Sequence, residues 1–321
     1  NVITIVAVLV AVPRAGPADA DRIEVVAWAV LVAGVVQLLM QVPVLMRFGY
    51  RPRAPVGWRD EKVRRVLGLM GPAALGLAVT QINVLIDRIL AAWVGSWAPA
   101  ALFFSERLIY FPLGIFATAM GTVLLPVMSG HAADQSADRA LRTFNYALRN
   151  LMFLMIPASV GLLVLARPIV QLIFGWRSFG GASIDQTMIA LQFYAPGLLL
   201  FSLNKVLVPV FYGHQDTRTP VRIGLWAVGI NFTLNVVFVL TWPPMMKHAG
   251  LAFATVLAAA ANGVVLSVIL HRRWGTPGWR SIAAGAARSL AAAAVMGVAA
   301  VTLHRSLEAW FGGWALPDKL Q

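Results

Sequence analysis

Charged residues and cysteine are what this 321-residue sequence has least of. Charged side chains make up 12% of the chain, whereas a soluble domain usually carries roughly a quarter. Hydrophobic residues make up 59% and the mean hydropathy is +0.76. Much of the surface must therefore face something other than water, and the lipid bilayer is the solvent that fits. The absence of cysteine excludes disulfides, a thiol nucleophile and a cysteine-type zinc site.

Apolar stretches recur along the whole chain and predict about nine transmembrane helices, since a span needs about 20 mostly apolar residues. They lie near residues 1–12, 25–46, 66–95, 98–128, 144–166, 187–211, 220–241, 249–270 and 280–303. The first stretch is short and starts without methionine, so we expect it to be a helix whose beginning lies upstream. A cleaved signal peptide is the alternative, but the stretch lacks a basic start and a small-residue cleavage site. The expected fold class is an all-α polytopic membrane protein.

Basic residues dominate the charge, with a net value of +13. They are concentrated in alternate loops, most densely in 47–65 and again within 139–149, 218–222 and 272–280. The positive-inside rule places these loops in the cytoplasm. This alternation supports the helix count and argues against nucleic acid as a partner, because the charges set topology and meet anionic headgroups of membrane lipids.

Few ionisable residues lie inside the predicted spans, and each costs at least about 2.5–3.5 kcal/mol at the bilayer centre. They are Asp87, Arg88, Glu106, Arg107, Lys205 and Arg288. Such residues usually face a cavity or a partner, so they are the candidate functional residues. The histidines lie near helix ends or in loops, and neither a carboxylate pair nor a His–acid arrangement indicates an enzyme.

Arg107 is the first candidate for substrate binding because it lies well inside its span. A guanidinium there can hold a phosphate by two parallel hydrogen bonds. The alternative is an arginine that extends to the outer headgroups, paired with Glu106. Lys205, in a helix interrupted by Pro196, either faces the same cavity or reaches the cytoplasmic interface, and Arg288 is expected to extend to the interface.

A second set of polar residues suits a small cation. Asn231 and Asn235 are one helical turn apart and share a face, and Thr255 lies in the following span. With Asp87 they provide a carboxylate, two amides and a hydroxyl, which are hard oxygen ligands suited to Na⁺. The alternative is that the asparagines form hydrogen bonds between helices while Asp87 pairs with its neighbour Arg88.

Three sets of motifs resemble the MurJ/MviN lipid II flippase family. The first is SERLIYFPLGIF at residues 105–116 with GTVLLP at 121–126. The second is KVLVPVFY at 205–212 with QDTRTPV at 215–221, and the third is GLAFAT at 250–255 with Asn262. They occur in the family's order and spacing, and the resemblance runs from residue 1 to about residue 303.

The resemblance implies a two-lobe, MATE-like fold of the MOP exporter superfamily, with this chain holding family helices five to thirteen. Residues 1–46 would end the N-terminal lobe, 47–65 would be a basic cytoplasmic linker, 66–270 a six-helix C-terminal lobe, and 280–303 the first helix of an accessory pair. Two further short segments resemble each other, LLPVMSGH at 124–131 and LVPVFYGH at 207–214.

The resemblance also implies a function: alternating-access transfer of lipid II, an undecaprenyl-diphosphate-linked peptidoglycan precursor, across the bacterial inner (cytoplasmic) membrane. Arg107, Glu106 and Lys205 would meet the substrate. Asp87, Asn231, Asn235 and Thr255 would hold a coupling Na⁺; no other cofactor is expected. Other cell-wall synthesis proteins are conceivable partners. The alternatives are a polysaccharide-lipid flippase or multidrug antiporter of the same superfamily, a polyprenyl-lipid enzyme, and a membrane scaffold without transport.

Overall fold

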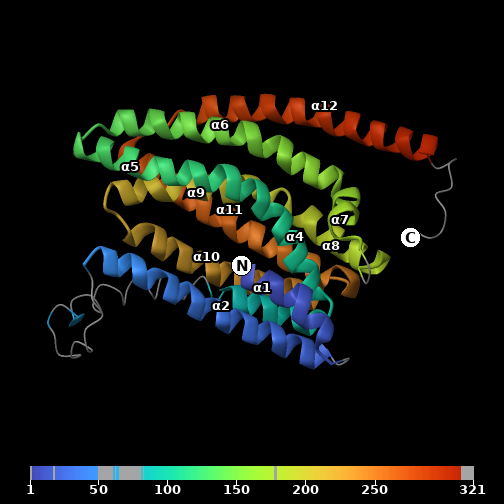
Figure 1. The fold of residues 1–321 in the computed structure, drawn as a ribbon. Helices are drawn as coiled ribbons and strands as arrows, with labels where there is room; N and C mark the ends of the chain where they lie inside the picture. The colour runs from blue at the N-terminus through green and yellow to red at the C-terminus, as the bar shows by residue number, and fades with distance from the viewer. Residues whose placement is uncertain are drawn as a thin grey trace. The chain divides into compact units, whose positions relative to one another are not determined.

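The computed structural model describes residues 2–16, 19–49, 61, 63–64, 81, 83–176 and 179–311, which form helices joined by short turns (Figure 1). Most of the predicted linker 47–65 and most of the predicted span 66–95 lie outside these residues. Of that span, residues 81 and 83–95 are described, and 81 and 83–94 are helical.

Contacts between residues divide the chain into two compact units, residues 1–71 and 72–321. The first unit contains α1 (Val2–Val6), η1 (Ala7–Ala11), η2 (Val12–Arg14) and α2 (Asp19–Arg47), and α1 packs against α2. Large apolar side chains of α2 remain exposed along its length, as expected for a helix that faces lipid.

The second unit is a helical bundle that includes helix 83–94. Its further helices are α4 (Ala98–Pro112), η3 (Leu113–Thr118), α5 (Ala119–Ala133), α6 (Ala137–Val164), α7 (Ala166–Phe174), α8 (Gly181–Tyr194), α9 (Gly197–Gly213), α10 (Arg218–Thr241), η4 (Pro244–Met246), α11 (Lys247–Trp274) and α12 (Trp279–Phe311). Within it α12 runs along α6, α10 packs on α11, and α5 packs on α9 (Figure 1).

The helices match the predicted spans. Six of the described helices are long and apolar enough to cross a membrane, and the bent pair α8–α9 makes a seventh. The shorter apolar helix Val2–Arg14 and helix 83–94 correspond to the first and third predicted stretches. The prediction of an all-α polytopic membrane protein is therefore confirmed.

Prolines act differently in different helices. Proline has no N–H to donate and its ring crowds the preceding turn. At Pro196 the chain bends by 49° between α8 and α9, and after Pro112 the six residues of η3 are π-helical. Pro157 and Pro209 instead lie inside uninterrupted α6 and α9. The predicted interruption at Pro196 is confirmed, and α9 places Lys205 beyond the bend.

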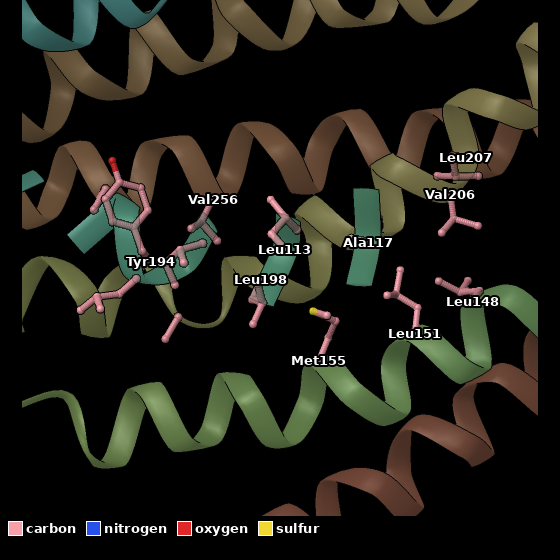
Figure 2. Close-up of a cluster of buried hydrophobic side chains, with 14 of the residues drawn as sticks. Leu113, Ala117, Leu148, Leu151, Met155, Tyr194, Leu198, Val206, Leu207 and Val256 are labelled. Atoms are coloured by element: carbon pink, nitrogen blue, oxygen red, sulfur yellow. The ribbon is translucent and has the colours of Figure 1, made fainter. Parts of the chain in front are cut away.

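A buried apolar core holds the second unit together where α6, α9 and η3 meet (Figure 2). Its labelled residues are Leu113, Ala117, Leu148, Leu151, Met155, Tyr194, Leu198, Val206, Leu207 and Val256. Tyr194 belongs to this cluster, but its hydroxyl oxygen points away from α6 (Figure 2). A polar atom at the margin of an apolar core needs a partner, and that partner belongs to the site described below.

The two similar segments, 124–131 and 207–214, lie on the neighbouring helices α5 and α9. Their glycines have opposite surroundings. A Cβ on Gly213 would lie 2.6 Å from the Met128 Cβ and 2.9 Å from backbone atoms of α5, whereas a Cβ on Gly130 would meet nothing within 4 Å. Of the two equivalent glycines in these segments, Gly213 is therefore the one required for close approach of the two helices.

Substitution of these glycines is expected to change stability in opposite directions. Gly213→Ala should lower the free energy of unfolding by about 1–3 kcal/mol, because backbone cannot move aside as a flexible side chain can. Gly130→Ala should raise it by up to about 1 kcal/mol, since alanine favours helix. Thermal unfolding of the two variants in detergent measures both. Equal losses at both positions would show that the close approach at Gly213 is not the cause.

The turn between α9 and α10 contains the QDTRTPV motif and is held by Asp216. Its carboxylate accepts hydrogen bonds from the Thr219 backbone N–H at 2.9 Å and from Thr219 Oγ1 at 2.6 Å, and it forms a salt bridge with Arg273 at the end of α11. Burial would raise the pKa of Asp216, but the bonds from Thr219 and Arg273 outweigh it and hold the pKa below its usual value. The charged carboxylate thus ties the α9–α10 turn to the end of α11.

Candidate substrate cavity and cation site

A cavity of about 630 Å³ lies among α4, η3, α5, α8, α9 and α11. Most of its lining is apolar. The polar lining residues are Glu106, Tyr110, Thr118, Thr122, Tyr194, Asn204, Lys205, Tyr212 and Thr255. Two of the three predicted substrate residues, Glu106 and Lys205, therefore face one space, and Thr255 of the predicted cation site borders it as well.

Glu106 is held by two neighbours from other helices. Its Oε2 accepts a hydrogen bond from Arg88 Nη2 at 2.7 Å, and its Oε1 accepts one from the Tyr194 hydroxyl at 3.2 Å. Arg88 Nη1 also donates to the Pro99 carbonyl at 2.9 Å. Arg88 thus pairs with Glu106 rather than with Asp87, and Glu106 pairs with Arg88 rather than with Arg107, which corrects both pairings weighed from the sequence.

Arg107 lies beside this network but outside the cavity lining. Its exposed guanidinium carbon sits 4.6 Å from the centre of the Phe103 ring, and the Arg88 guanidinium carbon lies 5.6 Å from the same ring. Arg107 also borders an apolar groove of about 570 Å³ between α4, α6 and α7. Two guanidinium groups therefore flank one aromatic ring, a favourable cation–π arrangement.

Polar bonds also connect α9 and α11 next to Lys205. Asn204 Oδ1 accepts from Asn262 Nδ2 at 3.1 Å, while Asn204 Nδ2 donates to the Ala259 carbonyl at 2.9 Å. Asn262 was singled out by its motif, and its role here is to fix two helices. Arg288 lies apart from these groups on α12, where it is exposed and donates to the Ala284 carbonyl.

The predicted cation residues come together from three helices. Asn235 Nδ2 donates to Asp87 Oδ1 at 2.6 Å, and the Asn231 amide lies 3.3 Å from Thr255 Oγ1. Asn231 and Asn235 are 2% and 0% exposed. Asn235 Oδ1 is buried, and no described residue donates to it. A buried amide oxygen without a partner is costly, so this cluster offers an acceptor to a further donor or a cation.

The neighbours of Asn231 fix the orientation of its amide. Its Nδ2 donates to Asn83 Oδ1 at 3.1 Å and to Asp87 Oδ1 at 3.0 Å, and its Oδ1 accepts from the Thr255 backbone N–H and Oγ1, each at 3.3 Å. The opposite orientation would set Asn231 Oδ1 against the Asn83 and Asp87 oxygens, where like partial charges repel each other.

Two residues of these networks, Asn83 and Tyr194, were not predicted. The pairing of Arg88 with Glu106 was not predicted either. Asn83 lies four residues before Asp87 and therefore on the same helix face, a signal that could have identified it. Nothing in the sequence indicated Tyr194, because an aromatic residue in an apolar span is usually a core residue.

The bent helical span, the polar network inside the bundle and the cavity that it borders define a multi-pass membrane protein with a partly polar internal cavity. Its structure resembles a solved MurJ lipid II flippase in an inward closed conformation (TM-score 0.71, 20% identity), covering 86% of this chain and 56% of that one. It also resembles an outward-facing MATE-family multidrug transporter of the MOP superfamily (TM-score 0.52, 17% identity), covering 63% and 43%. The MATE-like fold is thereby confirmed.

The chain belongs to the MurJ family of lipid II flippases, because the family model described as "Lipid II flippase MurJ" matches residues 1–319. A probable lipid II flippase MurJ of Vibrio cholerae is 39% identical over 75% of this chain and 45% of its own length. The lipid II flippase MurJ of Burkholderia cenocepacia is 32% identical over 79% and 50%. The chain thus spans about half the length of these curated relatives. It is a multi-pass protein of a family that resides in the bacterial inner membrane.

Proposed function

We propose that the protein containing this chain flips lipid II from the inner to the outer leaflet. The carrying observation is the cavity of about 630 Å³ inside the helical bundle, which is lined by Glu106 and Lys205 and whose Glu106 pairs with the Arg88 guanidinium. Basic groups in a largely apolar site suit a diphosphate that must leave water. The names of the relatives support lipid II as the substrate.

The proposed mechanism needs no bond chemistry from the protein. The long isoprenoid tail stays in the bilayer while the charged headgroup crosses through the cavity, whose cations replace its hydration. Access then alternates between the two sides of the membrane. The bend at Pro196 and the π-helical η3 are positions where the bundle can change shape, because both interrupt regular helical hydrogen bonding.

We further propose that Asp87, Asn231, Asn235 and Thr255, joined by Asn83, hold Na⁺ as a coupling ion. The support is the buried Asn235 Oδ1, to which no residue in the described part of the chain donates, and the Asn83, Asp87 and Thr255 oxygens around Asn231. Carboxylate, amide and hydroxyl oxygens suit a hard cation. A bound cation would supply the positive group that Asn235 Oδ1 lacks among the described residues.

Growth rescue tests the function. The complete gene product, expressed in bacteria depleted of their own lipid II flippase, is expected to restore growth and to move lipid II to the outer leaflet, where an externally added lipid II-cleaving colicin can reach it. A correctly inserted protein that restores neither would contradict the proposal. Transport of a polysaccharide-linked lipid by that protein would instead assign it to another branch of the superfamily.

A further inference from the structure

We propose that Glu106 is an internal counter-ion, which occupies the Arg88 guanidinium when the cavity is empty and yields it to the diphosphate of the substrate. This inference rests on the proposed function and extends it to two residues: Arg88 becomes a direct phosphate ligand, and Glu106 becomes the group that sets how tightly phosphate is held. The sequence-based expectation that Glu106 binds substrate is thereby changed into exchange with it.

The geometry places the pair within reach of the cavity. Glu106 lines it, and the side chains of Arg88 and Glu106 are 28% and 25% exposed, so the ion pair is neither sealed in the core nor free in solvent. A second hydrogen bond fixes the Arg88 guanidinium, because its Nη1 donates to the Pro99 carbonyl while its Nη2 donates to Glu106. A guanidinium with one nitrogen anchored can exchange the partner of the other without reorienting.

The surroundings of Arg88 favour a phosphate over the Glu106 carboxylate. The Arg88 and Arg107 guanidinium carbons lie 5.6 Å and 4.6 Å from the centre of the Phe103 ring, and Glu106 is the one carboxylate in the described residues that forms a salt bridge with either arginine. A phosphate can take two parallel hydrogen bonds from each arginine. Glu106 has an alternative partner, since the Tyr194 hydroxyl already donates to its Oε1.

Such an exchange also solves a problem of transport. A site with two unopposed guanidinium groups would hold a diphosphate too tightly to release it on the far side. A carboxylate that competes for the same guanidinium lowers the affinity and drives release. If the Arg88–Glu106 pair were purely structural, removal of the Glu106 carboxylate would not strengthen diphosphate binding. It would leave Arg88 unpaired and destabilise the bundle.

The test is binding of undecaprenyl diphosphate to the complete gene product in detergent, with the neutral alcohol undecaprenol as the reference lipid. Glu106→Gln should bind the diphosphate roughly tenfold more tightly, because the carboxylate that competes with it for the Arg88 guanidinium has been removed, and should bind undecaprenol unchanged. In an Arg88→Gln background the same change should bring no gain. Asp138→Asn, which removes the carboxylate of the exposed Asp138–Arg142 pair, is the matched control and should change neither affinity.

Tyr194→Phe provides a second test that leaves the ion pair intact. It removes the hydroxyl that donates to the Glu106 carboxylate after the diphosphate has displaced it from Arg88. Diphosphate binding should therefore weaken by about fivefold, the effect of one net hydrogen bond. If Glu106→Gln folds, unchanged or weaker binding of the diphosphate by this variant would overturn the counter-ion role. If Glu106→Gln does not fold, unchanged diphosphate binding by Tyr194→Phe would overturn it. If the unsubstituted protein itself prefers undecaprenol or binds both lipids equally, the proposed function fails instead.

Discussion

Replacement of Arg107 by alanine is expected to abolish growth rescue while leaving the protein folded. The side chain is exposed and forms no salt bridge within the described residues, and its contact with Phe103 contributes about 0.5–1 kcal/mol. Stability should therefore change little. Binding should change strongly, because each hydrogen bond to a charged group contributes about 1.5–3 kcal/mol and a guanidinium can donate two. A loss of one hundredfold or more in lipid II transport is expected.

Two further variants separate a role in phosphate binding from a role in membrane anchoring. Arg107→Lys keeps the charge but loses the forked donor geometry, so partial rescue is expected. Arg288→Ala removes another exposed arginine within a predicted span and should rescue fully. Full rescue by Arg107→Ala at equal membrane levels would assign Arg107 to the headgroup interface. Loss of rescue by both alanine variants would point to a general need for basic residues.

The fold could be predicted because a bilayer imposes strong constraints on sequence. Backbone groups in lipid must be satisfied within a helix, so long apolar runs identified the spans. The cytoplasmic side assigned to the basic loops stays a prediction. Helix bends were less predictable. Pro196 interrupts a span, whereas Pro157 lies within continuous α6. The difference depends on neighbouring helices, which local sequence does not specify.

The cation cluster could be predicted from spacing, but the Glu106 network could not. Asn231 and Asn235 reveal a shared face because they are one turn apart on α10. Arg88 and Glu106 lie eighteen positions apart on different helices, and their pairing depends on how helix 83–94 meets α4. Adjacent opposite charges such as Asp87 and Arg88 suggest a local pair, yet successive helical residues point in different directions and find different partners.

Sodium is expected to stabilise the complete gene product against thermal unfolding, and Asp87→Asn is expected to remove that effect. A ligand that binds the folded state at 100 times its dissociation constant adds about 2.7 kcal/mol to the free energy of unfolding. The comparison uses sodium chloride against choline chloride at equal ionic strength, so that general screening cancels. Equal unfolding temperatures of the unsubstituted protein in the two salts would contradict a sodium site.

Asn235→Asp gives the sharper test, because an ion site and a hydrogen-bond network predict different outcomes. Asn235 Nδ2 lies 2.6 Å from Asp87 Oδ1, so the substitution places two carboxylates in contact. In choline they should repel each other and lower stability under either interpretation. Sodium should restore the lost stability only if the cluster binds it, since a second carboxylate strengthens coordination of a hard cation. Destabilisation that is equal in both salts would leave the asparagines with a purely interhelical role.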